Sequence, residues 1–186
     1  MSAIVPLTGE PLALDLVNTR TAVGDLLTTS DDLRAWLELQ AGRLPDAQAA
    51  ADPGPDDLAA VRAVREHTAN ALHRVLRGEP PAEADLTALN DIQRAAPAIS
   101  ELTWNGSAIT AQRRRTGPIG APLAAWLAEA AADLLSDPAV TRIRQCEADD
   151  CVLLFLPAHP RRRWCSAARC GNRVRVARHY QRHKTV

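Results

Sequence analysis

Apolar residues in the first 140 positions recur mostly at helical spacing. They run almost without a break over 12–17, which predicts a short buried helix that Asn18 ends. Thr29 with Asp32 three residues later matches a capping box, so we expect a second helix to begin there and to end at Gly42.

Longer helical patterns follow a Pro- and Gly-containing segment, 44–55, that we expect to be a loop. From Asp56 or Asp57 the apolar positions repeat every three to four residues as far as Gly78. Similar patterns over 86–97 and 122–135 predict two more amphipathic helices.

One stretch between these helices has β character. Asn105-Gly106 separates two β-compatible runs within 99–113, which predicts a hairpin whose two central residues both adopt positive φ. The expected fold class is therefore mainly α, with a helical domain over 1–140 that carries one hairpin and a smaller module over 141–186.

The balanced charge of the chain conceals two oppositely charged parts. Lys+Arg and Asp+Glu number 22 each, but 142–186 holds ten Arg and Lys184 against three acids, a net charge of +8. The preceding 141 residues hold 11 basic and 19 acidic residues, a net charge of −8. This asymmetry predicts an acidic domain joined to a module that binds nucleic acid.

Composition also excludes several classes of protein. The chain has no nucleophile motif, Gly-rich phosphate loop or paired catalytic carboxylates, so we expect no enzymatic activity and assign no catalytic residue. It shows no targeting pattern and no apolar run that could span a membrane, which favours a cytoplasmic protein without a membrane partner. Six aromatic residues are few for single-strand or RNA binding, so double-stranded DNA is the expected partner.

All four cysteines lie near the end of the chain, at Cys146, Cys151, Cys165 and Cys170. Two close pairs in a reduced compartment predict a metal site rather than disulfides. Four thiolates satisfy tetrahedral zinc and leave no open position, so we expect one structural Zn²⁺ that holds a module too small to fold by burial alone. A redox switch or four free buried thiols are the alternatives.

The segments around these cysteines predict the layout of the module. We expect a β run over 152–156, a turn over 157–160, a returning segment over 162–164, and a helix from Gly171 to His183. This order resembles a treble clef. A rival ligand pair, His179 and His183, has the spacing found in fingers with two cysteine and two histidine ligands, but it would leave two cysteines without a role and follows Cys170 too closely.

The sequence Cys170-Gly171-Asn172-Arg173, preceded by Arg163-Trp164-Cys165-Ser166, resembles the CGNR zinc-finger family. The stretch 12–19, LALDLVNT, resembles the opening of the ABATE domain that commonly precedes that finger. The two resemblances imply a stress-induced transcription regulator that holds zinc through its four cysteines and binds DNA. This chain departs from the family pattern at 157–160, PAHP, which puts any contact made by that turn in doubt.

A helical wheel over the final helix separates an arginine face from an apolar face that contains Val176 and Tyr180. We expect six arginines to contact DNA, and the alternative is that this face is merely solvated. Asn172 and Arg173, by contrast, are expected to be structural residues around the metal site. The expected DNA contacts are Arg161, Arg162, Arg163, Arg175, Arg178 and Arg182.

Four polar residues of the acidic domain are candidates for a small-molecule effector pocket: Asp15, Asn18, Arg20 and Arg65. Internal caps and salt bridges are the alternative role for these side chains. The acidic domain would then sense an effector or mediate homodimerisation. The competing functions for the whole chain are a zinc module that binds a protein partner and a thiol redox sensor.

Overall fold

The computed structural model describes residues 6–44 and 52–183, and about 53% of these described residues are helical. The mainly α fold class is therefore confirmed. Most of the expected loop over 44–55 lies outside the described residues. The helices are α1 (Leu12–Val17), α2 (Ser30–Leu39), α4 (Pro55–Leu76), α5 (Glu83–Ala95), α6 (Ala121–Ser136) and α7 (Asn172–His183), with short helical turns η1 (Ala41–Arg43), η2 (Pro138–Arg142) and the π-helical η3 (Ala167–Gly171).

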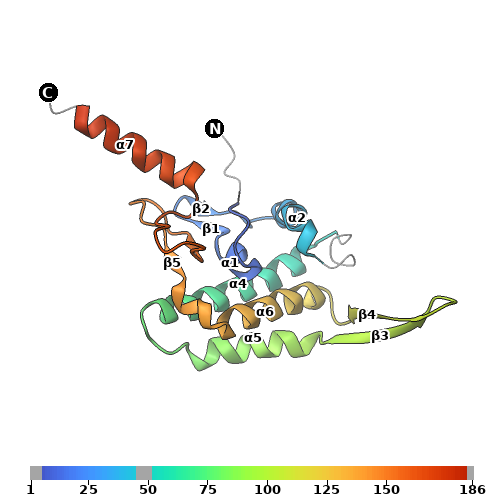
Figure 1. The fold of residues 1–186 in the computed structure, drawn as a ribbon. Helices are drawn as coiled ribbons and strands as arrows, with labels where there is room; N and C mark the ends of the chain where they lie inside the picture. The colour runs from blue at the N-terminus through green and yellow to red at the C-terminus, as the bar shows by residue number, and fades with distance from the viewer. Residues whose placement is uncertain (1–5, 45–51, 184–186) are drawn as a thin grey trace.

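The described strands form three two-stranded antiparallel ladders. Two of them are very short, and the third is a long arm that extends from the body on the side away from α7 (Figure 1). The strands are β1 (Arg20–Thr21) with β2 (Gly24–Asp25), β3 (Ala98–Trp104) with β4 (Ile109–Arg115), and β5 (Arg144–Gln145) with β6 (Leu154–Phe155).

The core lies between α4, α5 and α6, which run side by side, with α1 packed against α4 and α6 (Figure 1). The near-continuous apolar run of α1 is explained by its position, since residues 13–17 are all buried. Trp36 of α2 and Leu72 of α4 are among the largest fully buried side chains. Each fully buried Leu contributes about 1.5 to 3 kcal/mol of apolar transfer free energy to this core.

The start of α2 confirms the predicted capping box. The Thr29 hydroxyl accepts a hydrogen bond from the Asp32 N–H at 3.1 Å, and the Asp32 carboxylate accepts one from the Thr29 N–H at 2.8 Å. Hydrogen bonds from the Thr28 hydroxyl and from the N–H groups of Thr28 and Thr29 hold the pKa of Asp32 below its usual value, despite partial burial. The helix ends at Leu39, three residues before the predicted Gly42.

The hairpin is confirmed, but its turn differs from the prediction. Trp104 pairs with Ile109, so four residues form the loop, and Gly106 has φ +97° while Asn105 does not adopt positive φ. The Asn105 side chain closes this loop. Its Oδ1 accepts hydrogen bonds from the N–H groups of Ser107 and Ala108.

The strand pairing of the C-terminal module also differs from the prediction. Leu154–Phe155 pairs with Arg144–Gln145, which precedes the first cysteine, and not with the returning segment over 162–164. The Arg163 carbonyl of that segment instead accepts a hydrogen bond from the Glu147 N–H at 3.0 Å. The short ladder therefore encloses the first cysteine pair.

The C-terminal module packs into the main core. Ile143 and Leu154 belong to the same buried cluster as the helices, and the Asn18 side chain forms two hydrogen bonds of 2.8 Å with the N–H and carbonyl of Leu154. Glu10 accepts hydrogen bonds from the Leu156 N–H at 2.9 Å and from Arg162 at 2.6 Å. These contacts connect residues that lie more than 130 positions apart.

Asn18→Ala is expected to destabilise the whole chain. Asn18 and Leu154 are almost fully buried, so the substitution leaves a backbone N–H and a carbonyl without partners. We expect the free energy of unfolding to fall by about 2 to 3 kcal/mol, as measured by urea denaturation. Asn90→Ala, on an exposed face of α5, is the matched control and should change stability by less than about 0.5 kcal/mol. Equal stability of the two variants would refute the role assigned to Asn18.

Candidate metal centre

Two tight turns supply the four cysteines. Cys146 directly follows β5, and its N–H donates to the Leu153 carbonyl at 2.9 Å. The chain then turns so that the Cys151 N–H donates to the Ala148 carbonyl at 2.9 Å. These hydrogen bonds form a tight turn that brings Cys146 and Cys151 together, as a metal knuckle requires.

The second pair lies where the chain enters α7. Cys165 precedes η3 and Cys170 lies within it. The Ser166 hydroxyl accepts a hydrogen bond from the Arg169 N–H at 3.3 Å, and the Ser166 carbonyl accepts one from the Gly171 N–H at 3.0 Å. The metal ligands therefore fix the first turn of the helix that follows.

The geometry of the four sulfur atoms fits a single metal ion. All four lie within 4.8 Å of one another, with Cys151 and Cys165 3.9 Å apart and Cys165 and Cys170 3.5 Å apart. Tetrahedral zinc with Zn–S bonds of about 2.3 Å places its sulfur ligands about 3.8 Å apart. Among the described residues this is the cluster suited to a metal, and His179 lies outside it.

The environment of the thiols also favours a cation. Burial, together with the nearby sulfur atoms of Cys146 and Cys170, raises the pKa of Cys151 to about 11. Burial likewise raises the pKa of Cys165, and the sulfur of Cys170, 3.5 Å away, adds to the effect. Burial opposes ionisation of Cys146 too, but backbone N–H groups of Cys165 and Ala148 lower its pKa below the usual value. Four thiolates so close together are stable only when a cation offsets their repulsion.

Arg173 supports the cluster from α7. Its guanidinium donates to the Sγ of Cys170 at 3.5 Å and forms an ion pair with Asp150 at 2.6 Å. The sequence predicted that Arg173 would bond to carbonyls on the inward side of the helix, and this prediction is wrong. The partners of Arg173 are a sulfur atom and a carboxylate, and its side chain is half exposed. The sequence did not predict a role for Asp150, because the spacing of the two residues gives no sign that Asp150 lies beside Arg173. The Asn172 side chain is exposed, and Ser166 caps the turn.

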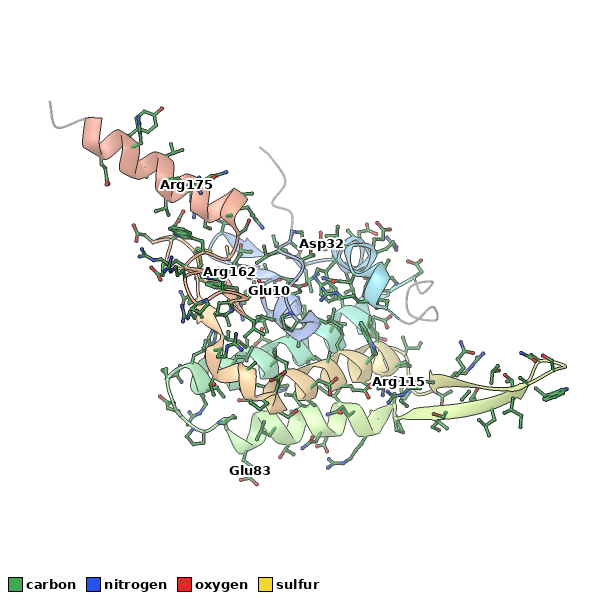
Figure 2. The ribbon with its side chains drawn as sticks, viewed as in Figure 1. Glu10, Asp32, Glu83, Arg115, Arg162 and Arg175 are labelled. Carbon is green, nitrogen blue, oxygen red and sulfur yellow. The ribbon has the colours of Figure 1, made fainter. Side chains whose placement is uncertain are left out.

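Arg162 lies inside the junction between the module and the helical domain (Figure 2). Besides Glu10, it donates to the carbonyls of Trp164 and Cys165, and its guanidinium lies 4.5 Å from the centre of the Phe155 ring. Its side chain is 29% exposed. The structure thus places Arg162 in an internal role that its neighbours in the Arg161–Arg163 run do not share.

The other expected DNA contacts lie on the surface or outside the described side chains. Arg161 and Arg175 are exposed, and Figure 2 shows Arg175 on the part of α7 that extends from the body. Arg163 is half exposed and pairs with Glu147 at 2.6 Å. The structure describes the backbone of α7 at Arg178 and Arg182 but not these two side chains.

The apolar face of α7 is less buried than the wheel suggests. Val174 packs against the cysteine cluster, but Val176 is 53% exposed and Tyr180 is 69% exposed. The reason is visible in Figure 1, where α7 leaves the body after its first turn.

Three of the four candidate effector residues meet at one pocket. Asn18, Arg20 and Arg65 line a cavity of about 200 Å³ between α4 and the C-terminal module. Asp15 is fully buried elsewhere, where burial raises its pKa although Arg43 donates to its carboxylate. Binding of an effector in this pocket stays a prediction.

The polar residues of that pocket already have partners in the protein. Arg65 is 1% exposed and donates to both oxygens of Asp25 at 2.6 Å, while Arg20 pairs with Glu66 at 3.1 Å. Burial would raise the pKa of Asp25, but the hydrogen bonds from Arg65 lower it below its usual value. Internal salt bridges, the alternative weighed for these residues, are therefore present.

Comparison with known families decides the classification. The ABATE family model, described as "Putative stress-induced transcription regulator", matches residues 10–138. The chain belongs to the ABATE family. The CGNR zinc-finger model matches residues 142–183, so the ABATE domain is followed by a CGNR finger, as the two motifs predicted. No curated protein matches the chain.

These matches agree with the chemistry of the site. The CGNR finger holds one structural Zn²⁺ through Cys146, Cys151, Cys165 and Cys170, with no open coordination position. Neither matched family is enzymatic. Over the described residues, no helix has the length and apolar character to cross a membrane.

Cys170→Ser is expected to reduce bound zinc from one ion per chain to well below half. A hydroxyl is a poor zinc ligand, and structural zinc contributes about 10 to 16 kcal/mol to small modules of this kind. Metal content of the purified protein, measured by atomic emission, tests this. Arg161→Ala, which changes an exposed arginine of the same module and no sulfur, should keep one equivalent. The assignment of four cysteine ligands fails if wild-type protein lacks zinc or if Cys170→Ser retains a full equivalent.

Arg173→Ala is expected to accelerate zinc transfer to a chelator by about ten-fold, because removal of a group that supports a ligand weakens metal sites by about 10- to 100-fold. Arg175→Ala, an exposed arginine on the same helix, should transfer zinc at the wild-type rate. Unchanged zinc retention in Arg173→Ala, together with loss of DNA binding, would instead make Arg173 a DNA contact.

Proposed function

We propose that this protein is a DNA-binding transcription regulator in which the CGNR finger, residues 141–186, contacts duplex DNA and the ABATE domain, residues 1–140, regulates it. The observation that carries the proposal is the position of α7, which is fixed at its base by Cys170 and extends clear of the body (Figure 1). Its remaining length is free to reach a partner.

The composition of α7 favours a polyanion as that partner. Residues 172–183 include four arginines, two histidines and no acid, and Arg175 is exposed. A twelve-residue helix is about 18 Å long. Such a helix fits a major groove about 12 Å wide, where arginines contact phosphates and guanine edges.

The proposed contact set is narrower than the six arginines expected from sequence. It comprises Arg161, Arg163, Arg175, Arg178 and Arg182. Arg162 is omitted, because its guanidinium is engaged by Glu10, backbone carbonyls and the Phe155 ring. Arg163 would exchange Glu147 for a phosphate on binding, at little cost, because the ion pair is exposed.

The double substitution Arg178→Ala with Arg182→Ala is expected to weaken binding of the zinc-loaded full chain to duplex DNA. It should also reduce the dependence of this binding on salt concentration. Each lost phosphate contact reduces the magnitude of the slope of log K against log salt by about 0.9. The slope of the double variant should therefore be smaller in magnitude than that of the wild type by about 1.8. Fluorescence anisotropy at several salt concentrations measures both quantities.

Arg77→Ala with Arg94→Ala provides the control, since both arginines are exposed and lie in the acidic domain. The control should keep the wild-type affinity and slope. The proposal is wrong if zinc-loaded wild-type protein does not bind duplex DNA, or if the Arg178/Arg182 variant keeps the wild-type slope.

Docking on a protein partner is the second candidate function, and the exposed Val176 and Tyr180 favour it. Apolar side chains on a projecting helix are typical of helix-in-groove recognition. The anisotropy experiment separates the two, because a module of this second kind would show no salt-dependent binding to duplex DNA.

A further inference from the structure

The β3–β4 hairpin is a long arm that leaves the helical body at the end of α5 and returns to the start of α6 (Figure 1). Its strands pair over seven residues each, which corresponds to a length of about 23 Å. Two strands without a further layer are only marginally stable in water. The arm therefore needs a covering surface that the described part of the chain does not provide.

One face of this arm is apolar towards its tip. The register pairs Leu102 with Ala111 and Trp104 with Ile109, and side chains of directly opposed residues lie on the same face. Leu102, Trp104 and Ile109 are 69%, 66% and 69% exposed. Together with Ala111 they expose roughly 400 Å² of apolar surface, a size at which such patches mark interaction sites.

The charges of the arm argue against a nucleic-acid partner. Three consecutive arginines lie on β4, but Arg114 pairs with Glu101 at 3.1 Å, and Arg113 and Arg115 both pair with Glu129 of α6. Because these two carboxylates offset all but one of the three positive charges, the arm offers no strip of unpaired arginines. Its apolar face is the feature that a partner would recognise.

That face is complementary to itself. Two arms packed face to face and antiparallel, with Leu102 at the centre, place Trp104 of one copy over Ser100 and Arg113 of the other, since these two residues pair on the same face two positions nearer the base. The Arg113 side chain is 68% exposed, and a guanidinium over an indole ring gives a favourable cation–π contact. Ile119, which is 81% exposed, lies just after β4 at the base of the arm. In this arrangement the tip of the partner's arm would lie near it.

We propose that the β3–β4 hairpin is a dimerisation arm that packs against the same hairpin of a second copy of this chain. The two arms bury roughly 400 Å² of apolar surface per copy, about half the area per partner of a standard interface. We therefore expect reversible association with a dissociation constant on the order of micromolar. This inference does not depend on DNA binding by α7.

Sedimentation velocity of the zinc-loaded full chain, from about 1 to about 100 µM, tests the proposal. Wild-type protein should shift from monomer to dimer over this range. Leu102→Ser with Trp104→Ser should remove the apolar face and raise the dissociation constant at least about ten-fold. The control Ile99→Ser removes an exposed apolar side chain from the opposite face of the arm, and this variant should dimerise like the wild type.

Helix content by circular dichroism and zinc content must match the wild type in each variant, which separates loss of the interface from loss of the fold. A second variant, Arg113→Ala, tests the predicted contact with the partner's tryptophan and should weaken association about three- to ten-fold. Wild-type protein that stays monomeric at about 100 µM, or a folded Leu102/Trp104 variant that still dimerises normally, would overturn the proposal.

Discussion

Four cysteine sulfur atoms within 4.8 Å of one another are the constraint on which the C-terminal part of this protein depends. The module around them has little apolar core of its own, and the cluster that contains the cysteines adds mainly Leu153, Phe155 and a few half-buried neighbours. Sulfur ligation of zinc replaces the burial that so short a segment cannot supply. The same ligation fixes η3, and through it the direction in which α7 leaves the body.

The finger is nevertheless joined closely to the ABATE domain. Asn18 forms two hydrogen bonds with the backbone of β6, and Glu10 accepts from both Leu156 and Arg162. Arg162 in turn donates hydrogen bonds to the carbonyls of the metal ligand Cys165 and of Trp164. A polar chain of contacts therefore runs from Glu10, at the start of the ABATE domain, to the metal ligand Cys165.

Two elements of the molecule extend beyond this packed assembly. The β3–β4 arm and α7 extend from different ends of the body, and each exposes apolar side chains that the described core does not use (Figure 1). The three arginines of β4 are all paired with Glu101 or Glu129 of the same chain, while α7 carries basic residues and no acid. This difference in charge is the physical basis for assigning the arm to a second copy and the helix to DNA.

The sequence by itself determined the features that depend on local chemistry. The cysteine spacing indicated the metal site, Thr29 and Asp32 indicated the capping box, and the 3.6-residue periodicity indicated α4, α5 and α6, because each signal lies within one turn, one knuckle or one helix. Tertiary structure alone decided the rest. It paired β6 with β5, directed Arg162 onto Glu10, and left Val176 and Trp104 exposed. These outcomes depend on which surfaces meet in three dimensions, and Glu10 and Arg162 meet across 152 positions of the sequence. Neighbours in sequence, such as Arg161 and Arg162, carry no signal that distinguishes an inward side chain from an outward one.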